Sequence, residues 1–445
     1  MIASMVGRLL RRPVYLILVA GLVAAFEGES TIMTYRKLYR ARALRIAILI
    51  LSVVLTGLLV GFSPQGSESS LTQIKTFEGG TAFRTSDDAY WVLSLNGTWR
   101  EMGRQYGGLV GDDLRKYYAD ISTDVATRGM DYDKQLENAK AIADGLNSNL
   151  NELLEGMAET SDLSEDEVLV LNAGMANLAI KAMGIEIPSS CSGLAAWDRY
   201  TPNGTLVFGR NWDMDRESMG KYMKYLSVVV FNPDSGNSFA NVHPLGSVFL
   251  ETGMNDKGLF VELNNGGSSD PHYVEGREDS ASVLATLLNE YSSLDEASKY
   301  LSEVPADYSY IIQLADTKEA VSVERPTFGT RVRRSDQNGV LAAYNSFIPP
   351  YPKEWEGKVA DPPKEEDDPR YSNLITLANS KEFFGNLDAD GMKRLMGIWI
   401  RDGGAMHEGS VYQVVAVPQE FRLWIRGLDY SDWQQVDLKD LFTNK

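Results

Sequence analysis

The distribution of apolar positions divides the chain into a helical stretch and a later stretch of strands. Residues 90–98 begin with an apolar run that predicts a strand, and they end in an Asn-Gly turn. Beyond this turn the apolar residues recur at helical spacing, which predicts helices over residues 100–118, 132–157 and 164–182. Ser164, followed by Asp166, supplies a capping signal for the third of these helices.

After Pro188 the apolar runs become short and are separated by turn residues such as Pro202-Asn-Gly and Pro233-Asp-Ser-Gly. These runs predict strands over residues 194–198, 206–211, 225–231, 248–252, 259–263, 309–315, 320–324, 340–344, 410–417 and 421–426. Helices are expected over residues 280–291, 294–302, 372–378 and 388–398, and a Pro-rich, charged loop over residues 349–369. Strands mixed with helices in this way predict an α+β domain built in layers.

Two apolar stretches, residues 14–26 and 44–62, open the chain. Four basic residues precede the second stretch: Arg36, Lys37, Arg40 and Arg42. A basic segment followed by a long apolar run is typical of a signal or membrane segment, so we expect the rest of the chain to be exported, either secreted or anchored. Met33 is a candidate for the true start. A two-span hairpin that keeps the bulk of the chain inside is the alternative.

Composition narrows the classes of partner. The chain carries a net charge of −18, which argues against nucleic acid and against a basic membrane-binding surface. We therefore expect contact with a membrane only through the N-terminal segment. Its single cysteine, Cys191, excludes an intrachain disulfide and is either a small buried residue or a reactive group.

The candidate chemistry lies around this cysteine. Pro188-Ser-Ser-Cys-Ser-Gly-Leu-Ala-Ala-Trp is followed by Gly204-Thr-Leu-Val-Phe-Gly-Arg-Asn-Trp-Asp. Cys191 opens the first predicted strand, a hairpin returns the chain, and the second strand brings Arg210 and Asp213 close to the thiol.

This arrangement resembles the self-processing N-terminal-nucleophile (Ntn) hydrolases. The matching branch contains the conjugated bile acid hydrolases, penicillin V acylases, acid ceramidase and isopenicillin-N acyltransferase. The resemblance covers most of the chain after residue 90, and Gly-Arg-Asn-x-Asp about twenty residues after a Cys-Ser is its most specific part. It implies a four-layer αββα sandwich with a helical segment upstream of the nucleophile.

Further segments carry the same resemblance and imply further site residues. Residues 252–265 are similar to the hairpin that supplies an oxyanion-binding Asn, where Asn265 matches the bile acid hydrolases and Asn264 suits the acyltransferases. Asn345 stands where relatives have a Thr-Asn step, and Arg370 lies in a segment similar to one of acid ceramidase. Residues 96–107 are similar to an upstream element of the acyltransferase-like members.

The N-terminal pattern and the resemblance together imply a division of the chain. Residues 1–62 are expected to form a leader with a signal or transmembrane segment at about 44–62, and residues 63–82 a linker. Residues 83–190 are expected to form an N-terminal helical part, and residues 191–445 the catalytic part.

The expected mechanism needs no histidine. Scission between Ser190 and Cys191 would free an α-amine, whose pKa is near ~8, on the residue that carries the thiol. Asp213 would hold this amine, and Arg210 would lower the pKa of the thiol. Asn345, with Asn265 or Asn264, would donate to the oxyanion, and Arg370 would steady the Asn site or the substrate. We expect a small-molecule N-acyl amide as substrate and no cofactor, and an oligomer is possible.

Other chemistries are less favoured. A papain-like pairing needs a histidine beside Cys191, but His243, His272 and His407 have no supporting signature. No His-Glu-x-x-His motif or cysteine pair indicates a metal site. An acyltransferase on the same site, and a surface binding protein that keeps the fold without activity, are the competing functions.

Overall fold

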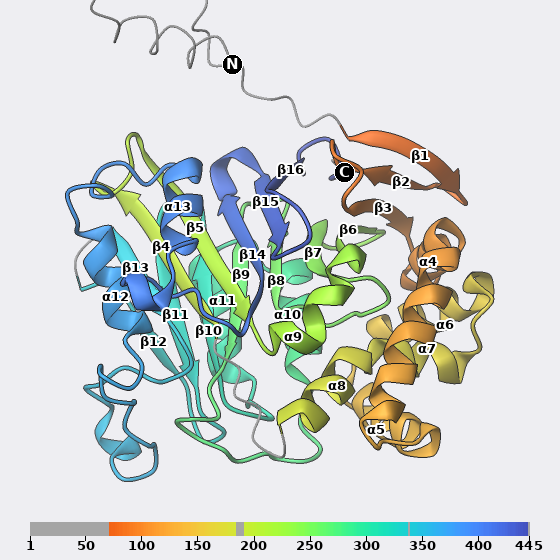
Figure 1. Cartoon of the computed structure of the whole chain (residues 1–445), viewed down its shortest axis with the longest axis horizontal. Coiled ribbons are helices and arrows are strands. Elements are labelled where there is room, and N and C mark those ends of the chain that lie inside the picture. The colour runs from red at the N-terminus through yellow and green to blue at the C-terminus, as the bar shows by residue number, and fades with distance from the viewer. Residues whose placement is uncertain (1–70, 184–190, 337–338, 444–445) are drawn as a thin grey trace, which may run out of the picture. The chain divides into compact units, whose positions relative to one another are not determined.

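The computed structural model describes residues 71–183, 191–336 and 339–443 (Figure 1). The expected leader, residues 1–62, lies outside these ranges. Within them, no helix is both long enough and apolar enough to cross a membrane.

Two β-sheets form the centre of the described chain. The larger sheet has the strand order β1 (Thr72–Phe77), β2 (Gly80–Arg84), β3 (Trp91–Gly97), β6 (Leu226–Pro233), β7 (Phe239–Pro244), β8 (Thr252–Asn255), β9 (Phe260–Asn265), β10 (Tyr310–Ala315), β11 (Ala320–Arg325) and β12 (Arg331–Arg333). The smaller sheet has the order β13 (Val340–Ala343), β4 (Ser192–Asp198), β5 (Gly204–Asp213), β14 (Ser410–Val417), β15 (Arg422–Gly427) and β16 (Gln434–Asp437). β3 pairs with β6 in parallel, so the segments before and after Cys191 share one sheet.

The sheets pack face to face, with helices on their outer faces. Phe208 of β5 and Phe260 of β9 pack with ring centroids 4.8 Å apart, which joins the inner faces of the two sheets. The neighbouring Gly209 faces outward against Met392 and Met396 of α13 (Ala389–Met396). α12 (Arg370–Ala378) also covers the smaller sheet, and α10 (Ser280–Glu290) and α11 (Leu294–Glu303) cover the larger one (Figure 1). The predicted α+β class is therefore confirmed, with four successive layers.

The helical part before Cys191 contains more helices than the sequence predicts. It comprises α4 (Trp99–Thr127), α5 (Tyr132–Gly145), α6 (Ser148–Ser161), α7 (Glu165–Asn172) and α8 (Gly174–Met183), and the short α9 (Arg216–Met219) follows later. The single helix predicted over 132–157 is wrong, because Asn147 caps a new helix through its side chain, which accepts from the N–H of Leu150. Ser164 does cap α7, but its reciprocal partner is Glu167 rather than Asp166.

Several predictions about the strands need correction. Residues 63–82 were expected to form a linker, yet β1 and most of β2 lie there; β1 is exposed, so it lacks the buried apolar positions that reveal a strand. β7 was not predicted, because polar Asn241 and His243 interrupt its apolar pattern although both are buried.

The strand predicted at 248–252 is also wrong, since β8 begins only at Thr252. Side chains satisfy the preceding backbone instead: Asn172 accepts from the N–H of Val248 at 2.9 Å, and Asn241 donates to the carbonyl of Phe249 at 3.0 Å.

Helix packing requires Gly103, in the segment 96–107, and Gly156 of α6. A Cβ on Gly103 would lie 2.2 Å from the carbonyl oxygen of Leu153, and one on Gly156 would lie 2.2 Å from that of Arg100. α4 and α6 therefore approach each other backbone to backbone. This observation assigns a structural role to the segment.

We expect Gly103→Ala and Gly156→Ala each to lower the free energy of unfolding by about 1–3 kcal/mol, because rigid backbone must move to admit the methyl group. Denaturant titration measures the change. Gly145→Ala is the matched control: its Cβ would meet only Asp279 Cβ at 3.4 Å, so helix propensity predicts no loss. Equal effects at all three glycines would contradict the packing argument.

Candidate active site

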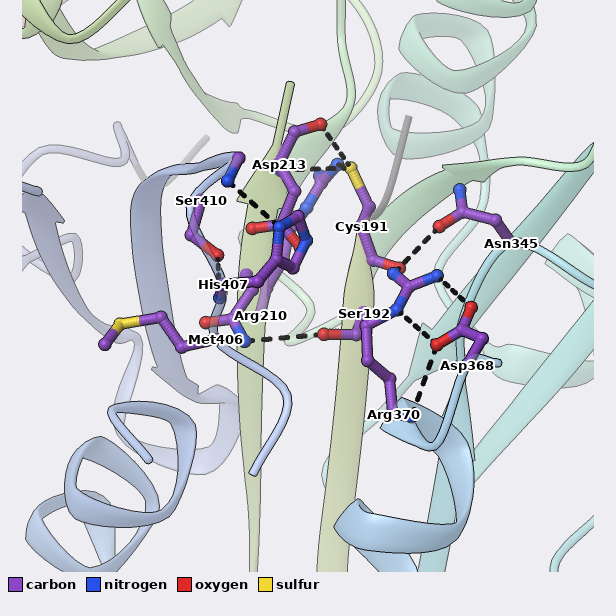
Figure 2. A network of polar contacts seen from close by, with 12 residues as sticks. Cys191, Ser192, Arg210, Asp213, Asn345, Asp368, Arg370, Met406, His407 and Ser410 are labelled. Atoms are coloured by element: carbon purple, nitrogen blue, oxygen red, sulfur yellow. Dashed lines mark hydrogen bonds and ion pairs between the residues drawn. The ribbon is translucent and has the colours of Figure 1, made fainter. Parts of the chain in front are cut away.

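Cys191 immediately precedes β4, and β4 pairs with β5 so that Gly193 faces Arg210 in register. The thiol is buried, donates to the carbonyl of Asp213 at 3.6 Å, and accepts from the N–H of Asp213 at 3.4 Å. Arg210 Nη2 lies 3.8 Å from the sulfur. Figure 2 shows the sulfur facing both residues. The predicted hairpin thus brings together the three residues that the sequence singled out.

Arg210 is fully buried and connects the two sheets. From β5 it donates to the carbonyl of Glu251, the hydroxyl of Thr252 and, at 2.7 Å, the carbonyl of Leu263. Its Nε lies 3.8 Å from the carboxylate of Glu262, which is also fully buried. Burial raises the pKa of Glu262 to about 7, although Arg210 acts in the opposite direction. Gly193 leaves room for this carboxylate, since a Cβ there would lie 2.1 Å from Glu262 Oε2.

Burial and the nearby charges act on the pKa of the Cys191 thiol in opposite directions. Burial raises the pKa of Cys191 to about 12, and the lowering effect of Arg210 is smaller. The negative charges of Asp213 and Glu251 raise it further. Arg210 thus acts in the predicted direction, but burial outweighs it. The thiol stays protonated at neutral pH until a base removes its proton.

Asp213 carries a buried carboxylate, and neither of its oxygens has a hydrogen bond within the described part of the chain. His407 Nε2 lies 3.2 Å from Asp213 Oδ2. The N–H of Gly409 donates to His407 Nδ1 at 3.0 Å, so in the neutral ring the proton lies on Nε2, where its direction does not form a hydrogen bond with Asp213. Sequence analysis missed this contact, because no local motif links residues 213 and 407.

Arg370, Asn345 and the backbone of Cys191 form a second network (Figure 2). Arg370 Nη1 donates to the carbonyl of Cys191 at 3.1 Å and to Asn345 Oδ1 at 3.2 Å. Asp368 fixes the guanidinium through contacts of 2.8 and 2.6 Å. Asn345 Nδ2 donates to the carbonyl of Asn265 at 2.9 Å. All of these residues gather at the start of β4.

The two adjacent asparagines at the end of β9 differ in surroundings. Asn265 lines the cavity that contains Cys191, and its Oδ1 accepts from the N–H of Gly267 at 2.8 Å. Asn264 is fully buried, and neither amide atom has a hydrogen bond to a described residue. Asn265 therefore has access to a substrate, while Asn264 faces the interior as Glu262 does.

A cavity of about 190 Å³ opens beside the thiol. Its walls include Cys191, Asp213 and Asn265, and most of the remaining lining is apolar: Met175, Ala176, Ala179, Trp212, Met214, Phe249, Leu250, Leu263 and Ala281. Three of the helical residues come from α8. An apolar cavity with a nucleophile in its wall suits an acyl chain.

The histidines do not pair with the thiol. In the described ranges the polar contacts of the sulfur are with Arg210 and Asp213, and none is with a histidine. His243 lines the cavity, and His272 contacts Asp270 at 2.5 Å. The structure thus offers no papain-like dyad among these residues.

Comparisons with known proteins give the following. A family model described as acyl-coenzyme A:6-aminopenicillanic acid acyl-transferase matches residues 199–421, which is half of the chain. No curated protein matches the chain.

Solved structures give weaker likenesses. An N-acylethanolamine-hydrolyzing acid amidase ortholog from Caenorhabditis elegans is 17% identical over 56% of this chain and 100% of that one, with a TM-score of 0.40. A variant of the conjugated bile acid hydrolase from Clostridium perfringens is 16% identical over 57% of this chain and 95% of that one, with a TM-score of 0.39. Penicillin V acylase from Agrobacterium tumefaciens is 16% identical over 56% of this chain and 88% of that one, with a TM-score of 0.38.

These structural scores are low, so the assignment rests on the family model. The chain belongs to the acyl-coenzyme A:6-aminopenicillanic acid acyl-transferase family.

Proposed function

We propose that the chain is a self-processing cysteine Ntn hydrolase that cleaves linear N-acyl amides through a thioester on Cys191. The observation that carries this proposal is the thiol at the wall of an apolar cavity, with Arg210 Nη2 3.8 Å from the sulfur and the buried carboxylate of Asp213 on the same strand.

The proposed reaction begins with scission between Ser190 and Cys191. The new α-amine has a pKa near ~8, so part of it is neutral at physiological pH and can take the proton of the thiol. This step is needed because burial raises the pKa of the thiol to about 12 in the uncut chain. Asp213, whose Oδ2 lies 3.2 Å from His407 Nε2, would hold the amine that results.

The sulfur then attacks the amide carbon, and the oxyanion needs donors. Asn345 is the first candidate, held by Arg370, and Asn265 is the second because it lines the cavity. One such donor is typically worth about 3 kcal/mol of barrier. The amine product leaves with the proton, and water hydrolyses the thioester.

The purified protein is expected to consist of two fragments, the larger beginning with Cys191. Intact mass spectrometry and N-terminal sequencing test this outcome together. An undivided chain that turns over N-acyl amides would contradict the proposed mechanism.

Acyl transfer on the same site is the second candidate, because the matching family model carries an acyltransferase description. Water and an amine would compete for the same thioester. Product analysis with an added amine acceptor separates hydrolysis from transfer.

A further inference from the structure

The charged residues that line the cavity beside Cys191 are acidic in the described part of the chain. Its charged lining residues are Asp213, Glu251 and Asp279, and its lining includes no Lys or Arg among the described residues. The cations nearby are already engaged. Arg210 donates to main-chain carbonyls and to Thr252, and Arg370 is held by Asp368. An anionic substrate would therefore meet carboxylates without a described cation to receive it.

The histidine in the wall does not neutralise these carboxylates. His243 is buried and its Nδ1 has no hydrogen bond to a described residue, although the ring lines the cavity. Its Nε2 lies 4.0 Å from Glu251 Oε2. Burial lowers the pKa of His243 against the opposing effect of Glu251, so the ring is neutral at physiological pH. The unpaired Nδ1 is a ready acceptor for an N–H of a bound molecule.

Asp279 lies at the start of α10, where it accepts from the N–H of Ala281 at 2.7 Å. It thereby offsets the positive end of this helix, which would otherwise attract an anion. Burial raises the pKa of Asp279 to about 7, and the charges of Asp307 and Glu251 add to the rise. A cation in the cavity would relieve this repulsion, whereas an anion would increase it.

We propose that the substrate is an N-acyl amide whose amine portion carries a second, cationic group, which the carboxylates of Glu251 and Asp279 receive. The apolar walls formed by α8, Phe249 and Leu250 would hold the acyl chain. This inference rests on the proposed amidase function and adds the charge of the leaving amine to it.

Three matched amides test the proposal by turnover: N-octanoyl-1,4-diaminobutane, N-octanoylbutylamine and N-octanoyl-4-aminobutyrate. We expect kcat/KM to be about tenfold higher for the cationic amide than for the neutral one, as one partly buried charge contact allows, and lowest for the anionic amide. Glu251→Gln and Asp279→Asn should each reduce the cationic-to-neutral ratio. Glu275→Gln is the control. It removes an exposed charge from the segment that precedes Asp279 and lies outside the cavity lining, so it should leave the ratio unchanged.

Binding provides a readout that does not depend on turnover. The Cys191→Ala chain keeps the cavity, and calorimetry with the same three amides should give the same order of affinity. A preference for the anionic amide, or equal binding of all three in wild-type and variant cavities, overturns the inference. Absence of turnover with the expected binding order overturns the amidase function and leaves the charge preference standing.

Discussion

Cys191→Ala is expected to remain an undivided chain and to lose turnover of N-acyl amides by at least about 10⁴-fold, because no other group near the cavity can form the thioester. The sequence contains no second cysteine that could substitute. The fold should survive, since the change removes one buried sulfur atom. Gel electrophoresis measures the first effect, and release of the free acid measures the second.

A matched control separates loss of the nucleophile from disturbance of the strand. Ser192→Ala removes the hydroxyl of the adjacent buried residue, which accepts from Asn211 Nδ2 at 3.4 Å. This variant should still be cut and should keep turnover within about a few-fold, as a weak neutral hydrogen bond predicts. Turnover by Cys191→Ala within tenfold of wild type would place the nucleophile elsewhere.

Arg210→Met is expected to lower the free energy of unfolding by about 3–5 kcal/mol at pH 8, because it leaves the buried Glu262 carboxylate without its cation. The carbonyls of Glu251 and Leu263 also lose their donor. Both proteins should carry Cys191→Ala, which keeps the chain undivided. Denaturant titration can then compare the free energy of unfolding of two single chains that differ only at residue 210.

The loss should shrink as the pH falls. The pKa of Glu262 is raised from 4.5 to about 7 in the folded protein, so its contribution is most favourable below pH 4.5 and is lost as the pH rises through 7. Removing Arg210 raises the pKa of Glu262 in the folded protein further, so the loss of stability through Glu262 continues to a higher pH. The difference between the two proteins should therefore be smaller at pH 5.5 than at pH 8.

Two further variants check this argument. Adding Glu262→Gln to Arg210→Met should restore part of the lost stability at pH 8, because the unpaired charge is gone. Arg401→Met removes an exposed arginine whose nearest carboxylate lies 3.9 Å away, and it should change stability by less than about 1 kcal/mol. A loss for Arg210→Met that is the same at both pH values would show that Glu262 is not its cause.

The sequence predicted that Cys191, Arg210 and Asp213 lie together because they belong to one hairpin. Strand pairing with a short turn fixes the register, so Cys191, Arg210 and Asp213 are brought together by local structure. Helices and strands were also predicted correctly where the apolar residues recur at a regular spacing, as in α10, α11 and the hairpin of β14 and β15. Local capping rather than periodicity decided where the upstream helices break.

The tertiary structure alone decided how residues far along the chain contact the site, although the resemblance had already placed Arg370 among the candidates. Arg370 reaches the carbonyl of Cys191 across 179 positions, and His407 reaches Asp213 from just before β14. The burial that raises the pKa of Cys191, and the carboxylates that line its cavity, likewise depend on how the two sheets and α8 pack. A local pattern fixes the pairing of neighbouring strands, but burial and charge at a site are sums over segments far apart in the chain, and only the folded packing determines them.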